Sequence, residues 1–221
     1  MSRTVLITGA NRGIGLELAR HYAKQGDNVI GVCRETSDEL NQIAFKVIEH
    51  IDVTSPSSVG QLASALSNTS VDILINNAGL FSNETLGELD FESIERQMEV
   101  NAYAPLRITQ ALLPNLTSGS KIANITSRMG SIEDNTSGNY YGYRASKAAL
   151  NAFGKSLAMD LKPKGIAVAL LHPGFVQTRM VGFNGDISPE QAASGLAQRI
   201  EELNINNTGG FWHSNGEQLP W

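Results

Sequence analysis

The sequence predicts an α/β fold in which one doubly wound parallel β-sheet is flanked by helices on both faces. Short β-branched apolar runs alternate with longer stretches of helical periodicity, and this alternation is typical of parallel β-α-β units joined by right-handed crossovers. The runs are apolar almost throughout, which indicates strands that are covered on both faces. No repeat, charge block or Pro/Ser-rich linker divides the chain, so residues 1–221 are expected to form a single domain.

Short runs rich in Val, Ile and Thr are expected to be strands. They lie at residues 4–7, 28–32, 45–51, 71–75, 121–125, 166–171 and, at the carboxyl end, 210–213. The stretches between them repeat apolar residues at the spacing of a helix with one buried face. These helices are expected at residues 14–24, 57–66, 91–113, 143–161 and 189–203. Because ligands of open α/β sheets bind beside the carboxyl ends of the strands, the residues that follow each strand are the functional candidates.

Composition and charge argue against several functions. The 17 Lys and Arg and 22 Asp and Glu residues give a formal net charge of -5, which opposes a nucleic acid or an anionic membrane as the main partner. The single cysteine, Cys33, excludes an internal disulfide, and the four scattered histidines lack metal-ligand spacing. The amino terminus lacks the pattern of a signal peptide, and the apolar runs are too short to cross a bilayer. A cytoplasmic protein without a metal is therefore expected.

A glycine-rich turn follows the first expected strand and opens the first expected helix. Residues 8–15 read Thr-Gly-Ala-Asn-Arg-Gly-Ile-Gly. Glycines at these places allow a sharp turn and a close approach to a pyrophosphate, and the N–H groups and dipole of a helix amino terminus favour phosphate. The run could also be a plain strand-to-helix turn, but its place after the first strand favours dinucleotide binding.

Tyr143 and Lys147 stand four residues apart on an expected helix, so their side chains share one face. An ordinary tyrosine has a pKa of about 10, and the neighbouring ammonium is expected to lower that pKa toward the range of proton transfer. Ser127 ends a strand where ligands bind. Alternatively, Tyr143 is an amphipathic-helix residue, Lys147 is solvated and Ser127 caps a turn. Tyr140 and Tyr141 lie nearby, but neither has a lysine four residues on.

Together these motifs resemble the classical short-chain dehydrogenase/reductase family, which has a Rossmann-type sheet and binds a nicotinamide cofactor. The Thr-Gly-x-x-x-Gly-x-Gly turn of that family is matched within residues 8–15. The other matches occur in the family's order at Asp52-Val53, Asn76-Asn77-Ala78-Gly79, Asn101, Ser127, Tyr143-x-x-x-Lys147 and Pro173-Gly174. The length and the ending, residues 216–221, are most similar to the short carbonyl-reductase and C-factor-like group.

The resemblance implies roles for the matched residues. Ser127 would bind the carbonyl oxygen of the substrate, and Tyr143 would act as general acid or base. Asn101 would hold a water that links Lys147 to solvent, although it could also be a polar helix residue that faces water. The expected cofactor-binding residues are Gly9, Asn11, Arg12, Gly13, Ile14, Gly15, Arg34, Asp52, Val53, Asn77, Ala78, Gly79, Tyr143, Lys147, Pro173, Gly174, Val176 and Thr178.

The expected cofactor is NADP(H). Family members that prefer NAD(H) usually end their second strand with an acidic residue, which repels a 2′-phosphate. Here Cys33 stands at that position and Arg34 follows it. Arg12 approaches from the glycine turn, so two guanidinium groups can bind one phosphate. Alternatively, Arg34 is a solvated partner of Glu35 and Arg12 an exposed loop residue, and Glu35 could bind the ribose of NAD(H).

The sequence therefore predicts an NADP(H)-dependent oxidoreductase that interconverts a ketone or aldehyde and its alcohol, in the direction of reduction. A catalytically weak nucleotide-sensing or signalling protein on the same fold is the alternative. A medium-sized apolar carbonyl compound is expected as the substrate, in a relatively open cleft. The apolar residues near the cleft, which could equally be core residues, are Phe81, Met129, Ile132, Phe175, Met180 and Phe183. By resemblance, a homo-oligomer is expected, with a tetramer favoured over a dimer.

Overall fold

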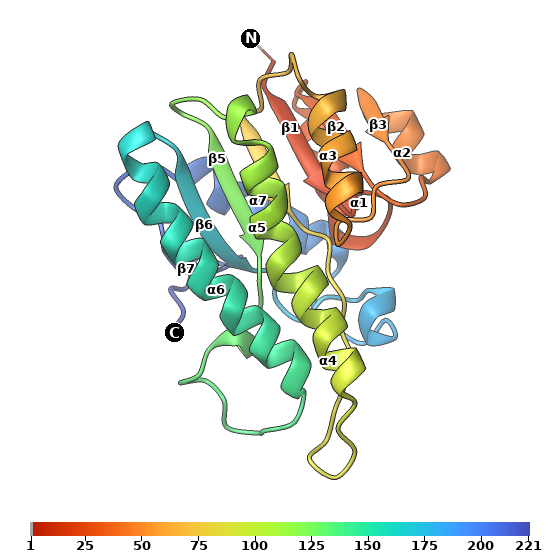
Figure 1. Cartoon of the computed structure of the whole chain (residues 1–221), viewed down its shortest axis with the longest axis vertical. Helices are drawn as coiled ribbons and strands as arrows, with labels where there is room; N and C mark the ends of the chain where they lie inside the picture. The colour runs from red at the N-terminus through yellow and green to blue at the C-terminus, as the bar shows by residue number, and fades with distance from the viewer. Residues whose placement is uncertain (1) are drawn as a thin grey trace.

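The computed structural model describes residues 2–221 and arranges them around a seven-stranded parallel β-sheet (Figure 1). The strands are β1 (Thr4–Thr8), β2 (Asn28–Val32), β3 (Lys46–Ile48), β4 (Ile73–Asn76), β5 (Lys121–Ile125), β6 (Ala167–His172) and β7 (Phe211–His213). Their order across the sheet is β3-β2-β1-β4-β5-β6-β7, and each neighbouring pair is parallel. The chain winds outward in both directions from β1 and β4, which confirms the expected Rossmann-type, doubly wound α/β fold.

Helices cover both faces of this sheet. They are α1 (Gly13–Lys24), α2 (Asp38–Ile43), α3 (Pro56–Ala65), α4 (Phe91–Met98), α5 (Ala104–Ala111), α6 (Tyr141–Leu161) and α7 (Pro189–Glu202). In Figure 1, α3, α5 and α6 lie in front of the sheet, and α1 and α7 lie behind it. Within residues 2–221, no helix combines the length and the apolar character needed to cross a membrane.

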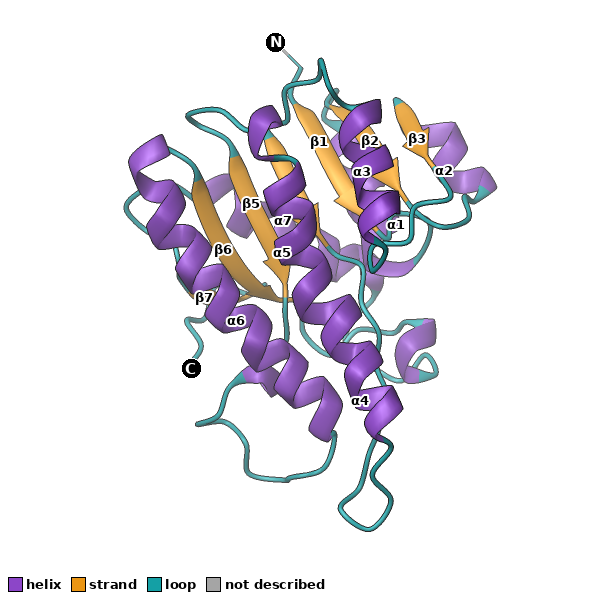
Figure 2. Ribbon diagram, in the orientation of Figure 1, coloured by secondary structure: helices purple, strands orange, loops and turns teal. Residues whose placement is uncertain are grey.

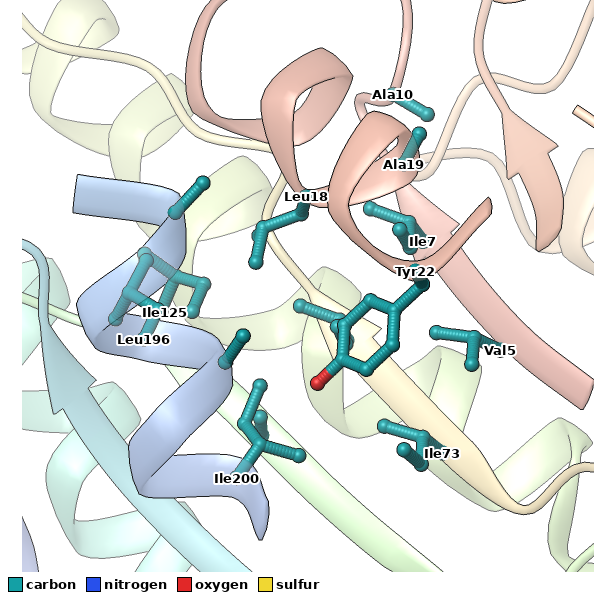
Figure 3. Close-up of a cluster of buried hydrophobic side chains, with 14 of the residues drawn as sticks. Val5, Ile7, Ala10, Leu18, Ala19, Tyr22, Ile73, Ile125, Leu196 and Ile200 are labelled. Atoms are coloured by element: carbon teal, nitrogen blue, oxygen red, sulfur yellow. The ribbon is translucent and has the colours of Figure 1, made fainter. Parts of the chain in front are cut away.

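The sheet has an apolar core on each face because successive side chains of a strand point in opposite directions. On β1, Val5 and Ile7 pack with residues of α1 and α7, whereas Leu6 packs with residues of α3, α5 and α6. Figure 3 shows the first of these clusters, in which Tyr22 of α1 lies among side chains of β1, β4 and α7. Full burial of one such aliphatic side chain stabilises the fold by about 1.5–3 kcal/mol. The two cores fix the strands and leave their carboxyl ends for the site.

The helix expected over residues 91–113 is divided by a π-helical segment. α4 continues into Glu99–Tyr103, which has π-helical hydrogen bonding, and α5 follows directly. A π-helical turn inside an α-helix contains one extra residue and is frequent at functional sites. In this segment Asn101 is fully buried, so the alternative that it is a polar helix residue facing water is wrong.

Two further differences lie at the sheet edge formed by β3. The strand expected at residues 45–51 is shorter and spans Lys46–Ile48. β3 is an edge strand that pairs only with β2 among the described strands, and Phe45 is 71% exposed. α2, which begins after Ser37 and buries Leu40, is not among the helices that the sequence predicts. A helix of six residues with one buried side chain is too short to show a period. The other elements begin and end within about two residues of the expected positions.

Candidate active site

The residues that follow the strands gather at one end of the molecule. Figure 2 shows the strand arrows pointing the same way, with the long loops after β4, β5 and β6 beyond their tips. The glycine turn follows β1 at this end, and Ser127 follows β5. Parallel pairing therefore brings together residues that are far apart in the chain, as expected for an open α/β sheet.

The glycine turn between β1 and α1 requires glycine for its backbone conformation and has no room for a side chain at Gly15. Gly9 and Gly13 have φ angles of 66° and 55°, in the left-handed region that favours glycine. A Cβ atom at Gly15 would collide with the carbonyl oxygen of Gly9 and would lie 2.5 Å from Nδ2 of Asn77. Among the described residues, no side chain caps α1, and its first turn contains no acidic residue. Such a cradle of backbone at a helix amino terminus fits the pyrophosphate of a dinucleotide.

Hydrogen bonds join this turn to the end of β4. The Thr8 hydroxyl accepts from the backbone N–H groups of Asn77 and Ala78, at 3.0 and 3.1 Å. The Asn77 amide donates to the carbonyl oxygens of Thr8 and Gly9, at 3.0 and 3.2 Å. Gly79, the next residue, is exposed. Asn77 and Ala78 thus lie beside the glycine turn, and Gly79 follows them directly.

The two candidate phosphate-binding arginines lie on adjacent loops. The Asn11 side chain donates to the carbonyl oxygen of Glu35 at 2.8 Å, which joins the glycine turn to the segment after β2. Arg12 and Arg34 flank this bond, and both are exposed. Within residues 2–221, neither guanidinium has a carboxylate oxygen within 4.0 Å. The ion pair that Arg34 could have made with Glu35 is therefore absent from this part of the chain.

Asp52 lies close to Arg34, because the backbone after β3 continues to pair with the backbone after β2. Ile51 N–H donates to the carbonyl oxygen of Cys33 at 3.1 Å. Asp52 Oδ1 accepts from the N–H and hydroxyl of Thr54, at 2.9 and 2.8 Å. These bonds, with a smaller contribution from the charge of Arg34, lower the pKa of Asp52. Asp52 is thus held as a carboxylate, and the neighbouring Val53 is half-buried.

The segment after β6 reaches the glycine turn from the opposite side. Gly174 has a φ of 97°, and Val176 then forms a parallel bridge with Ile187. This turn brings Thr178 next to Gly13, where a Cβ atom would lie 3.6 Å from the Thr178 methyl group. The cofactor-binding residues predicted after β6, which also include Pro173, therefore border the same site as the glycine turn.

The α6 face that the sequence predicts carries a phenol and a buried ammonium. Lys147 is 4% exposed, and its Nζ lies 5.7 Å from the centroid of the Tyr143 ring. The ammonium donates to the carbonyl oxygen of Ile125, at the end of β5, at 2.9 Å. The side chain of Ser127 interacts with the Tyr143 phenol. Tyr141, by contrast, is 40% exposed at the start of α6, so Tyr143 is the tyrosine that joins this group.

Asn101 holds the loop after β4 in place. Its side chain accepts from the N–H of Leu80 and donates to the carbonyl oxygen of the same residue, both at 2.8 Å. It also donates to Ser146 Oγ at 3.0 Å, and that hydroxyl donates to the carbonyl oxygen of Tyr143 at 2.8 Å. Asn101 therefore links the π-helical segment to both the β4 loop and α6.

Residues 3–187 match the family described as short chain dehydrogenase. The chain belongs to this family. The 1-hydroxy-2-glutathionyl-2-methyl-3-butene dehydrogenase of Rhodococcus sp. (strain AD45) is 41% identical over 224 residues, covering 99% of each chain. The C-signal protein of Myxococcus xanthus is 43% identical over 154 residues, which are 68% of this chain and 93% of that protein.

Solved structures support the same assignment. The NADPH-bound carbonyl reductase from chicken fatty liver has a TM-score of 0.91 and 30% sequence identity, and the match covers 100% of this chain and 99% of that one. Similarity to this carbonyl reductase and to the C-signal protein confirms the expected likeness to the carbonyl-reductase and C-factor-like group of short-chain dehydrogenases.

Burial sets the protonation of the central pair in this short-chain dehydrogenase. It raises the pKa of Tyr143 to about 12, and the interaction with the Ser127 side chain lowers it only in part. Burial also lowers the pKa of Lys147 to about 8. The expectation that the ammonium lowers the pKa of the phenol is wrong for this structure, because loss of hydration is the dominant influence on the phenol and raises its pKa. At neutral pH the phenol keeps its proton and can donate it.

Two buried polar residues beside the site were not among the predicted site residues of this short-chain dehydrogenase. Ser146 bridges Asn101 and Tyr143, and its place three residues after Tyr143 is a signal that could have identified it. Glu84 lies in a polar loop without periodicity, yet it is 3% exposed. No sequence pattern distinguishes Glu84 from the exposed acidic residues around it.

Proposed function

We propose that this short-chain dehydrogenase reduces a ketone or aldehyde to an alcohol with NADP(H) as its cofactor. The observation that carries the proposal is the grouping of Ser127, Tyr143 and Lys147 at the sheet edge that also holds the glycine turn. A turnover assay with NADPH and a panel of carbonyl compounds tests it. Oxidation of NADPH with apolar ketones is expected, and a panel in which polyols and charged metabolites are the better substrates would overturn the substrate assignment.

The chain's own residues supply binding and proton transfer. A nicotinamide cofactor, when bound, supplies the hydride. The Ser127 hydroxyl donates a hydrogen bond to the carbonyl oxygen of the substrate, which stabilises the negative charge that develops there. The neutral Tyr143 phenol gives its proton to that oxygen, and the ammonium of Lys147 keeps a positive charge beside the ring.

Apolar side chains at the rim support an apolar carbonyl substrate. Ile132, Phe175 and Phe183 are 82%, 50% and 68% exposed on the loops after β5 and β6. The ring of Phe81 meets the Tyr143 ring edge to face, with centroids 4.9 Å apart. Contact with an aryl or alkyl group would remove these apolar side chains from water, which is favourable. The surroundings of the Tyr143 phenol therefore favour a substrate that carries an aryl or alkyl group.

We propose NADP(H) rather than NAD(H) because Arg12 and Arg34 approach the same place without carboxylate partners among the described residues. Cys33, at the position where an acidic residue would repel the 2′-phosphate, is buried. The chicken carbonyl reductase, which shares the fold over the whole chain, binds NADPH.

Removal of either arginine should weaken the binding of NADPH about 10- to 100-fold. A hydrogen bond to a charged group contributes roughly 1.5–3 kcal/mol, and about 1.4 kcal/mol is tenfold in affinity. The measurement is the ratio of kcat/KM for NADPH over NADH in the wild type, Arg12→Ala, Arg34→Ala and Cys33→Asp. The ratio should exceed one in the wild type and fall in each variant. A wild-type ratio below one, or arginine variants that lose both cofactors equally, would contradict the assignment.

The rate of carbonyl reduction should fall above about pH 8. With its pKa lowered to about 8, Lys147 carries its charge below that pH and loses it above. Tyr143, with a pKa of about 12, keeps its proton throughout this range. Initial rates from about pH 6 to 10 are compared between the wild type and Lys147→Arg, whose guanidinium stays charged. The variant should lack the fall, and an identical fall in both proteins would assign it to another group.

A further inference from the structure

Glu84 is a buried carboxylate that the proposed mechanism does not use. It lies in the loop between β4 and α4 and is 3% exposed. One carboxylate oxygen accepts from Gln97 Nε2 at 2.7 Å, from the Ser93 hydroxyl at 3.1 Å and from the Ser82 hydroxyl. The other accepts from the backbone N–H of Gly142 at 3.1 Å. The carboxylate thus joins its own loop to α4 and to the first turn of α6.

Glu84, which lies outside α6, caps the amino terminus of this helix. Tyr140, the N-cap residue of this helix, has a φ of 55°, and among the described residues its side chain makes no capping hydrogen bond to the helix. The backbone N–H of Tyr140 donates to the carbonyl oxygen of Glu84 at 2.9 Å, and the N–H of Gly142 donates to the Glu84 carboxylate, 58 residues away in sequence. A negative charge at this place also interacts favourably with the helix dipole.

The hydrogen bonds favour an ionised Glu84. The Gly142 N–H and the Gln97 amide nitrogen can only donate, and both oxygens of a carboxylate are free to accept. Burial alone would raise the pKa of Glu84, but the bonds from Ser82, Gly142 and Ser93 outweigh burial and lower it. The surroundings of residue 84 therefore stabilise a carboxylate. A glutamine side chain there would place its N–H group against another donor, either Gln97 or Gly142.

The anchored turn leads directly to the phenol. Gly142 precedes Tyr143, and a Cβ atom at Gly142 would lie 3.0 Å from Cα of Ile94 and would collide with the Gln97 amide. The Glu84 loop also contributes Phe81, whose ring contacts the Tyr143 ring. The first turn of α6 is thus packed closely on α4, and a change in the Glu84 bonds would move Tyr143 relative to Ser127.

We propose that Glu84 is a positioning residue for Tyr143. It caps α6 from the β4 loop and thereby fixes the distance between the phenol and Ser127. This inference rests on the proposed role of Tyr143 as proton donor. Glu84 lies outside the cofactor turn, so its effect should fall on the chemical step and spare cofactor binding.

Glu84→Gln tests the proposal, with Glu88→Gln as the matched control from the exposed part of the same loop. We expect Glu84→Gln to lower kcat about 10- to 100-fold, as a small misplacement of a reacting group can do. The Kd for NADPH should stay within about threefold of the wild-type value. Hydrogen exchange of the backbone N–H groups at residues 141–147 should be faster in Glu84→Gln and unchanged in Glu88→Gln.

A second substitution should reverse the defect. The double variant Glu84→Gln, Gln97→Glu exchanges the two side chains, so the carboxylate introduced at position 97 accepts from the amide nitrogen introduced at position 84. The carbonyl oxygen of that new amide then accepts from the N–H of Gly142. Both kcat and the slow exchange at residues 141–147 should return toward wild-type values. A general loss of stability in the single variant would instead speed exchange across the central sheet as well as at residues 141–147.

The outcomes separate the positioning role from the proposed function. Wild-type kcat and exchange in Glu84→Gln, or a double variant that remains as impaired as the single one, would overturn the role of Glu84. An equal rise of Kd for NADPH and fall of kcat would also overturn it. If the wild type reduces no carbonyl compound while the exchange pattern changes and is restored as described, the proposed function fails and the cap on α6 stands.

Discussion

Replacement of Tyr143 by phenylalanine should lower kcat for carbonyl reduction by about 10²- to 10⁴-fold, the usual contribution of a general acid. The phenylalanine ring keeps its edge-to-face contact with Phe81 and its place beside Lys147, so the fold of α6 is preserved. Only the proton donor and its interaction with Ser127 are lost. The developing charge on the substrate oxygen then lacks the proton that neutralises it.

The measurement is kcat at saturating NADPH, together with the Kd for NADPH from a binding titration. Tyr141→Phe is the matched control, because Tyr141 is exposed and two residues from Tyr143. We expect the control to retain wild-type kcat and both variants to retain the wild-type Kd within about threefold. Comparable turnover in Tyr143→Phe and the wild type would rule out Tyr143 as the proton donor.

Gly15→Ala should weaken the binding of NADPH by about 100-fold or more. The added Cβ would collide with the carbonyl oxygen of Gly9 and lie 2.5 Å from the Asn77 amide, so the turn must move. Loss of two hydrogen bonds to phosphate, at roughly 1.5–3 kcal/mol each, accounts for at least this factor.

Gly60→Ala is the control for the substitution itself. Gly60 lies in α3, and a Cβ atom there would meet no described atom within 4 Å. Alanine in a helix interior is favoured over glycine by roughly 0.5–1 kcal/mol, so this variant should bind NADPH normally and unfold at the same or a higher temperature. Wild-type affinity in Gly15→Ala would show that the glycine turn does not hold the phosphates.

Local patterns predict much of the fold and of the site. The strand and helix periods, and the glycine turn after β1, are properties of neighbouring residues, so the sequence shows them directly. Parallel topology then places Ser127 and the α6 pair at the same edge. The spacing of Tyr143 and Lys147 predicts a shared face, which the structure shows as a distance of 5.7 Å from the ammonium to the ring.

Features that depend on tertiary packing are not visible in the sequence. The π-helical segment at Asn101 forms where the helix packs against the β4 loop, and no local signal marks it. The pKa of Tyr143 is set by burial rather than by its neighbour on the helix. The bond from Glu84 to α6 joins residues that are 58 positions apart, and only the folded chain brings them together.

Transfer of deuterium tests the central claim most directly. The wild-type protein is given NADPH deuterated at the nicotinamide C4 position that is transferred, together with an apolar ketone, and the product is analysed by mass spectrometry and NMR. We predict an alcohol with one deuterium on its carbinol carbon and one NADPH consumed per alcohol formed. An alcohol without deuterium, or no consumption of NADPH with any carbonyl compound of the panel, would contradict the proposal that this chain is an NADPH-dependent carbonyl reductase.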